Sequence, residues 1–266
     1  MPETFFILLA GGIMLAAAVS NSNDVTLPWL RLAGMIAWCM VALSMFFYFT
    51  RDVASTYSPL LRNVQIGLLI ATLVAIVAQL ATVQMAWRSA QRACAFAAFI
   101  LSVLAGSNLL HELMDDRVPF PPKLLSMTLQ AIACAGVGAT VGLALMDMLL
   151  GHAYLTASKM TIAPFRRLNL ALAAALALRC VCAVPLALAL NAWRPIEGLW
   201  NLNLFMIATR WVVGLLVPAV FVYMAHDCIK RRSTQSATGI LYVAGVLIFI
   251  GEIVALYLVR QTGLPF

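Results

Sequence analysis

The sequence predicts an all-α integral membrane protein, a bundle of about eight transmembrane helices. Of its 266 residues, 64% are hydrophobic and 10% are charged, whereas a soluble domain carries about 25% charged residues. A surface so poor in charge has to face lipid rather than water. Inside a bilayer every backbone N–H and C=O needs an internal partner, which leaves helices or closed barrels. The apolar runs are long and do not alternate, so we expect helices.

Eight apolar runs follow one another along the chain, separated by short loops. A helix needs about 20 residues to cross the hydrocarbon core, and each run has roughly that length. The expected spans are residues 4–20, 27–50, 63–87, 92–113, 124–150, 168–192, 203–226 and 237–259. Because the loops are too short for a soluble domain, we expect residues 1–266 to form a single polytopic membrane domain.

The ends and bends of these spans have local signals. The residues before the first span include no Lys or Arg, so we interpret it as a retained span rather than a signal peptide. Proline separates the middle spans, and residues 233–236 form a Ser/Thr-rich N-cap cluster before the last one. Pro185 and Pro218 fall inside the sixth and seventh spans, where proline kinks a membrane helix and frees a carbonyl.

The basic residues predict how the chain is oriented. Six lie in the loops after the even-numbered spans. Eight lie in the loops after the odd-numbered spans: Arg88, Arg92, Lys159, Arg166, Arg167, Lys230, Arg231 and Arg232. The positive-inside rule places this set in the cytoplasm and both termini outside, in an inner or plasma membrane. His111, Glu112, Asp115 and Asp116 then face the outer compartment, as a solvated acidic helix end or as a docking patch for a basic partner.

Two segments of the sequence share several residues at a constant offset. Ala86-Trp87-Arg88 recurs as Ala192-Trp193-Arg194, and Tyr48 and Tyr154 match at the same offset. This alignment lays the second to fourth spans on the fifth to seventh. An offset of three spans would make the two copies inverted, as in many transporters. Chance agreement between two Ala/Leu-rich stretches is the alternative.

Three charged residues lie deep inside predicted spans: Arg179, Arg210 and Glu252. Counted at 1.5 Å per residue, their depths are similar enough for one cluster. Ionisable residues inside a membrane are rare and functional by default, although a buried ion pair that only fixes helix packing is the simpler interpretation. Two arginines and one glutamate leave a surplus positive charge, so we expect an anionic or polar ligand, or a proton relay through Glu252.

A second group of polar residues lies near the cytoplasmic ends of two spans: Asp147, His152, His226 and Asp227. Two histidines on different helices could hold a b-type haem, a quinone head or a proton-uptake site, or could simply form interfacial hydrogen bonds. Arg166, Arg167, Lys230, Arg231 and Arg232 beside them could bind propionates or anionic headgroups. We expect no metal site and no disulfide, since the six cysteines lie mostly within apolar runs.

These features suggest three functions. The first is a membrane subunit of an electron-transfer or respiratory complex that handles quinone or protons, with other subunits as partners. The second is a secondary transporter for a small anion, and the third is a structural or assembly subunit. Each would be a lipid-embedded protein that binds no nucleic acid, and a partner-dependent subunit is favoured over a stand-alone enzyme with catalytic residues of its own.

Overall fold

A computed structural model describes residues 1–20, 25–51, 59–113, 123–156, 161–193 and 203–262, and within these ranges all regular structure is helical. The helices are α1 (Pro2–Val19), α2 (Leu27–Thr50), α3 (Pro59–Gln84), α4 (Arg88–Leu113), α5 (Lys123–Thr156), α6 (Ala163–Trp193), α7 (Asn203–Ala208), the π-helix η2 (Thr209–Leu216), α8 (Val217–Lys230) and α9 (Thr234–Thr262). Since α7, η2 and α8 are continuous, they form one rod, and the predicted helical bundle is confirmed.

The predicted spans match these rods closely. Among the residues that the structure describes, seven helices are long and apolar enough to cross a membrane, and the described part of α6, which includes Arg166, Arg167 and Arg179, is not one of them. Several rods are longer than predicted: α5 continues six residues past residue 150, α6 begins five residues before 168, and α9 extends three residues beyond each end of 237–259. Length and composition therefore confirm a multi-pass membrane protein.

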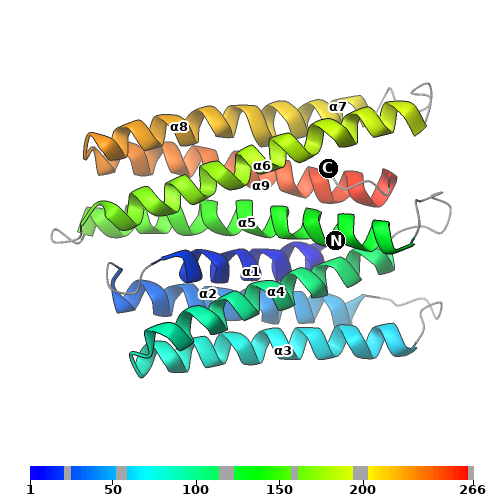
Figure 1. Ribbon diagram of the computed structural model, residues 1–266, viewed down its shortest axis with the longest axis horizontal. Coiled ribbons are helices and arrows are strands. Elements are labelled where there is room, and N and C mark those ends of the chain that lie inside the picture. The colour runs from blue at the N-terminus through cyan, green and yellow to red at the C-terminus, as the bar shows by residue number, and fades with distance from the viewer. Residues whose placement is uncertain (21–24, 52–58, 114–122, 157–160, 194–202, 263–266) are drawn as a thin grey trace.

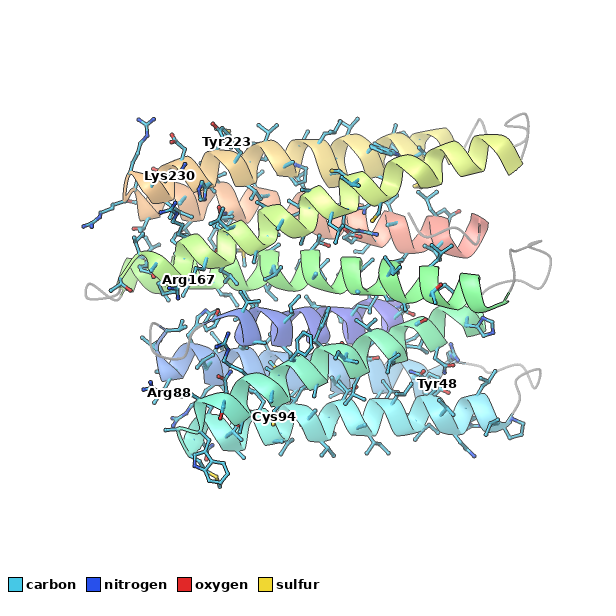
Figure 2. All side chains as sticks on the ribbon, in the orientation of Figure 1. Tyr48, Arg88, Cys94, Arg167, Tyr223 and Lys230 are labelled. Carbon is cyan, nitrogen blue, oxygen red and sulfur yellow. The ribbon has the colours of Figure 1, made fainter. Side chains whose placement is uncertain are left out.

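The outer surface of the bundle is apolar over most of its length. Figure 2 shows side chains projecting outward from every rod. Among them are Val74, Val181 and Tyr223, which are 61%, 67% and 74% exposed. Large apolar side chains at this exposure are stable against lipid tails and not against water. We infer that lipid covers this surface.

Successive rods run in opposite directions, so α1 begins and α9 ends at the same end of the bundle (Figure 1). The labelled residues Arg88, Arg167 and Lys230 all lie at the opposite end (Figure 2). The loops grouped by their basic residues in the sequence are thus on one side of the bundle. Which side of a membrane this is remains a prediction from the positive-inside rule.

The rods form two rings of four with the same pattern of neighbours. In the first ring, α1 and α3 each pack against α2 and α4. In the second, α5 and α8 each pack against α6 and α9. The rings meet where α1, the first helix of one, packs on α5, the first helix of the other, in the middle of the molecule (Figure 1).

Two turns occur at the same place in the two rings, before the fourth rod of each. Ala86 follows α3 and Arg232 follows α8, and these are the two non-glycine residues with positive φ among the described residues. Each turn is closed by the same pair of bonds: Trp87 N–H to Thr82 O and Ala86 N–H to Val83 O in one, Ser233 N–H to Cys228 O and Arg232 N–H to Ile229 O in the other. Such bonds satisfy the last carbonyls of a helix.

The packing of the described helices therefore repeats every four rods, whereas the inverted repeat inferred from the sequence has a period of three spans and stays a prediction. A shift of four rods restores the original direction, and it matches both the ring contacts and the two turns. Trp-Arg pairs recur because tryptophan and arginine both anchor helix ends at a membrane interface.

Glycine allows α1 and α5 to approach closely. A Cβ atom added at Gly142 would lie 2.0 Å from the carbonyl carbon of Gly12, and one added at Gly12 would lie 1.7 Å from the carbonyl oxygen of Gly138. No side chain fits in that space. Small residues at a helix crossing are the usual way for membrane helices to pack tightly, so this crossing is what joins the two rings.

We predict that Gly142→Ala lowers the free energy of unfolding by about 1–3 kcal/mol, since the new methyl group forces the two backbones apart. The matched control is Gly245→Ala on α9, where an added Cβ meets nothing within 4 Å. Thermal unfolding of both variants in detergent micelles measures the difference. An equal loss in the two variants would contradict the interpretation.

Candidate functional site

The three deep charges predicted from the sequence meet at one point inside the second ring. Glu252 on α9 is fully buried, and its Oε2 accepts a hydrogen bond from Arg179 Nη2 at 2.5 Å. Its Oε1 accepts three more: from Arg179 Nε at 3.3 Å, Arg210 Nη2 at 3.2 Å and Thr140 Oγ1 at 2.9 Å. We call Thr140, Arg179, Arg210 and Glu252 the Arg–Glu cluster.

Glycine on the surrounding helices makes room for the two guanidinium groups. A Cβ at Gly136 on α5 would lie 2.6 Å from Arg179 Cδ. A Cβ at Gly251 on α9 would lie 2.2 Å from the Cα of Gly214 in η2, so these two backbones touch beside Glu252. Arg210 and Gly214 are both buried residues of η2. A π-helix is rare and is found most often at functional sites.

The cluster holds more positive than negative charge. Arg179, Arg210 and Glu252 are 5%, 1% and 0% exposed, and no second carboxylate bonds to either arginine among the described residues. Arg210 Nε and Nη1 are buried without a hydrogen-bond partner in that part of the chain. An unpaired buried charge costs several kcal/mol, and these two nitrogens are donors that a further acceptor oxygen could satisfy.

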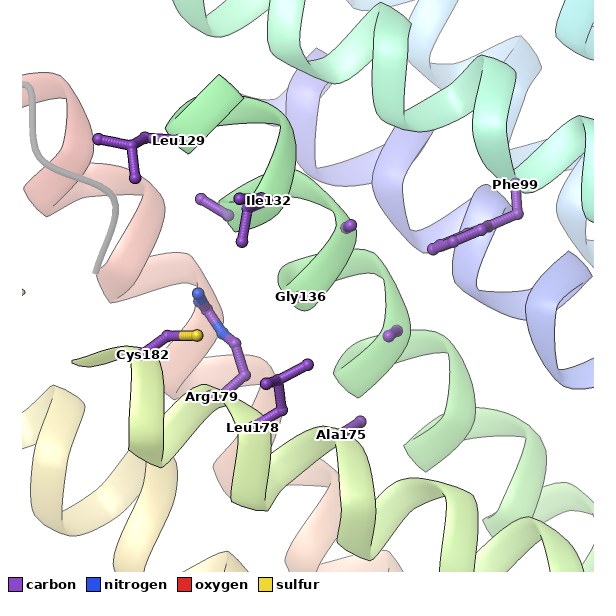
Figure 3. A pocket seen from close by; sticks show the side chains of 11 residues that line it. Phe99, Leu129, Ile132, Gly136, Ala175, Leu178, Arg179 and Cys182 are labelled. Carbon is purple, nitrogen blue, oxygen red and sulfur yellow. The ribbon is translucent and has the colours of Figure 1, made fainter. Parts of the chain in front are cut away.

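A cavity of about 520 Å³ lies beside the cluster, between α4, α5 and α6. Figure 3 shows Arg179 running along it between Leu178 and Cys182, with Ile132 and Gly136 opposite and Phe99 at the far side. Apart from Arg179 and Cys182 the lining side chains are apolar. Ile132 and Leu178 are 58% and 60% exposed on the outer surface. The cavity therefore opens toward lipid and contains one cationic group.

The second predicted group is only partly brought together. Asn169 on α6 donates from Nδ2 to Asp147 Oδ2 at 3.1 Å, and its Oδ1 lies 3.2 Å from Nδ1 of His226 on α8. Asp147 and Asn169 are fully buried and His226 is half-buried. We call these three residues the Asp–Asn–His chain.

The other two members of that group lie apart from this chain. His152 is exposed on α5, and Asp227 forms an exposed ion pair with Arg231 at 3.0 Å. His226 contacts Asn169 through Nδ1, and His152 is exposed on a different helix. The haem hypothesis gains no support from this geometry.

The remaining predicted residues are at the ends of the bundle. Arg166, Arg167, Lys230, Arg231 and Arg232 are all exposed at the basic end, where headgroup phosphates can reach them. At the other end, His111 is exposed near the end of α4, and Glu112 follows it in the same helix. Asp115 and Asp116 lie outside the described residues. No group of three metal-ligating side chains occurs among the residues that the structure describes.

Sequence reasoning missed Thr140, Asn169 and Gly136. A helical register would have found the first, because Gly136 and Thr140 are four apart and Asp147 follows seven later, on one face of α5. On α6, buried positions recur every three or four residues from Phe165 through Asn169 to Arg179. Asn169 is a polar residue on this buried face, and it lies between Arg167 and Arg179 in the sequence. That pattern could have identified it.

We predict that Glu252→Gln yields a folded protein whose free energy of unfolding is about 3–5 kcal/mol lower, because two buried arginines lose their counter-charge. Asp227→Asn, which removes the exposed pair with Arg231, should cost at most about 0.5 kcal/mol. Chemical unfolding in detergent measures both. A loss as small for Glu252→Gln as for Asp227→Asn would show that the cluster is hydrated and not buried.

Comparison with known proteins adds no further constraint on this site. No protein-family model matches the sequence. The chain also matches no curated protein and no solved structure at a significant level.

Proposed function

We propose that this protein is a quinone-binding membrane subunit of an electron-transfer complex, with the quinone head at Arg179. One observation carries the proposal: a cavity in the lipid-facing surface, apolar over nearly all its lining, ends on an arginine that is ion-paired behind it. An apolar lining selects a ligand that is dissolved in the bilayer. A single cationic donor inside it selects a head with a carbonyl or carboxylate oxygen.

The dimensions and chemistry of the site support this ligand. Pockets for small organic ligands measure roughly 300–1,000 Å³, and this one is about 520 Å³. Arg179 bonds Glu252 through Nε and Nη2, and its Nη1, which bonds to no other described residue, is the donor for a quinone carbonyl. The tail would extend past Ile132 and Leu178 into lipid.

Reduction of a quinone to a quinol takes up two electrons and two protons. In this proposal the electrons come from a redox centre on a partner protein. Glu252 lies directly behind Arg179 and is the acidic group nearest the proposed head. Arg179 would stabilise the negative charge that develops at the head. The two protons would come from water, one of them by way of Glu252.

Anion transport is the second candidate function, and the surplus positive charge of the cluster favours it. Arg210 keeps two donors without a partner, as a site for an anion would. A water-soluble anion, however, needs a polar route to the site, and the cavity beside it is apolar. We therefore rank transport below quinone binding, and a structural role, in which the cluster only fixes packing, third.

The location of the protein is part of the same proposal. The basic end of the bundle, which includes Arg167 and Lys230, would face the cytoplasm, and both termini would lie outside a cell membrane. The exposed arginines at that end would contact anionic headgroups. The outer acidic residues, His111 to Asp116, would be available to a partner subunit.

We predict that a photoreactive short-tailed benzoquinone labels peptides of α5 and α6 in protein reconstituted into lipid nanodiscs. Ala175→Trp, which fills the cavity from α6 one turn from Arg179 and replaces no charged residue, should weaken quinone binding at least about tenfold, or ~1.4 kcal/mol. Competition with an unlabelled short-tailed quinone gives the dissociation constants.

The matched control is Leu170→Trp, which adds the same ring to an exposed position of α6 outside the cavity and should leave binding unchanged. Labelling elsewhere, or equal binding by both variants, would overturn the proposal. Uptake of a labelled small anion by proteoliposomes, without quinone binding, would support the transport alternative instead.

A further inference from the structure

Asp147 is a fully buried carboxyl group whose surroundings differ from those of Glu252. Its Oδ2 accepts one hydrogen bond from the amide of Asn169 at 3.1 Å. Its Oδ1 is buried without a partner among the described residues. Where Glu252 receives four bonds, three of them from arginine, Asp147 receives a single bond from a neutral group.

The helices packed around Asp147 bring no counter-charge to it. On α6, Arg166 and Arg167 are exposed at the helix start, and neither forms an ion pair or a hydrogen bond with Asp147. On α8 the nearest titratable group is His226, which contacts Asn169. Asp227 and Lys230 beyond it lie at the surface of the basic end. Helix α1 contains no Lys or Arg, and the one arginine of α9, Arg260, is near the end of that helix away from the basic end. On α4, Arg88 is exposed and Arg92 donates to the carbonyl oxygen of Ala18.

An ionised carboxylate is expensive in such a place. Moving a charge from water into a region of low dielectric costs several kcal/mol or more unless a cation pairs with it, and the group then takes up a proton instead. Asn169 offsets only part of that cost. We propose that Asp147 is a proton-binding site, loaded from the basic end of the bundle through His226.

The Asp–Asn–His chain supplies the route. His226 is half-buried and lies one turn before Lys230, the last residue of α8 at the basic end. The Asn169 amide accepts from Nδ1 of His226 on one side and donates to Asp147 on the other. Asn169 is thus a positioning residue that fixes both groups. A hydronium ion at that end gives up a proton and leaves water. The proton is held for a time by the imidazole of His226, whose new N–H bond breaks again, and it ends as an O–H bond on Asp147 Oδ1.

This site is separate from the Arg–Glu cluster. Thr140 and Asp147 are seven residues apart on α5, or about 10 Å along the helix axis. The buried residues at intermediate positions, Ala144, Leu172, Leu176 and Ile248, are apolar. The proton site therefore goes beyond quinone binding at Arg179, and either can be right without the other.

Infrared spectroscopy of the purified protein in nanodiscs tests the proposal directly, since a protonated carboxyl has a C=O stretch that a carboxylate lacks. Protein labelled with ¹³C at the aspartate side-chain carboxyl should show a shifted band of this kind at neutral pH. The band should be absent from Asp147→Asn and retained in Glu252→Gln. No aspartic acid band in the labelled wild type, or a band that survives Asp147→Asn, overturns the proposal. The wild-type result stands even if the variant misfolds.

The route is tested by transfer into heavy water, where exchange of the carboxyl proton lowers the band frequency. His226→Phe should slow this exchange about a hundredfold, the lower range for a positioned proton-transfer group. His152→Phe, the same change at an exposed histidine of α5, should leave the rate unchanged. Equal rates in the two variants would overturn loading through His226. Quinone binding enters none of these measurements.

Discussion

The second half of this protein is organised around the carboxylate of Glu252. Four hydrogen bonds reach its two oxygens from α5, α6 and η2, so one side chain of α9 ties together the inner faces of all its neighbours. In a bilayer the hydrophobic effect does not hold helices together, and packing and polar contacts take over that role. The charges that make a site here are the same charges that hold the ring closed.

The two rings show what the fold requires and what it leaves free. Both have the same order of helices and the same turn before the last helix, yet their buried charges differ. In the first ring buried Glu3 of α1 pairs with the partly exposed Arg51, whereas in the second ring two buried arginines share one carboxylate. Gly106 holds the position in α4 that Glu252 holds in α9, counted from the first residue of each helix. A Cβ there would lie 2.6 Å from Leu8 Cδ2, so an apolar side chain fills the place of the carboxylate. A ring with the same order of helices thus forms with no carboxylate at this place.

The two polar sites within the second ring differ in a way that separates their chemistry. The Arg–Glu cluster has an excess of cationic donors and borders an apolar cavity, so it suits an acceptor oxygen on a lipid-soluble molecule. Asp147 has a deficit of donors and a route toward the basic end, so it suits a proton. An apolar layer between them keeps the two apart. A membrane protein that couples protons to a redox or transport reaction needs such a division.

The sequence by itself determined that this is a helical membrane bundle, because long apolar runs admit no other structure in lipid. It also placed Arg179, Arg210 and Glu252 at a common depth, since depth follows from counting residues along a helix. It could not determine which faces turn toward each other. Only the tertiary structure decided that Thr140 and Asn169 join the sites, that His152 stays outside them and that the helices repeat in fours. Each of these depends on helix rotation and neighbour choice, which a nearly uniform apolar sequence leaves open.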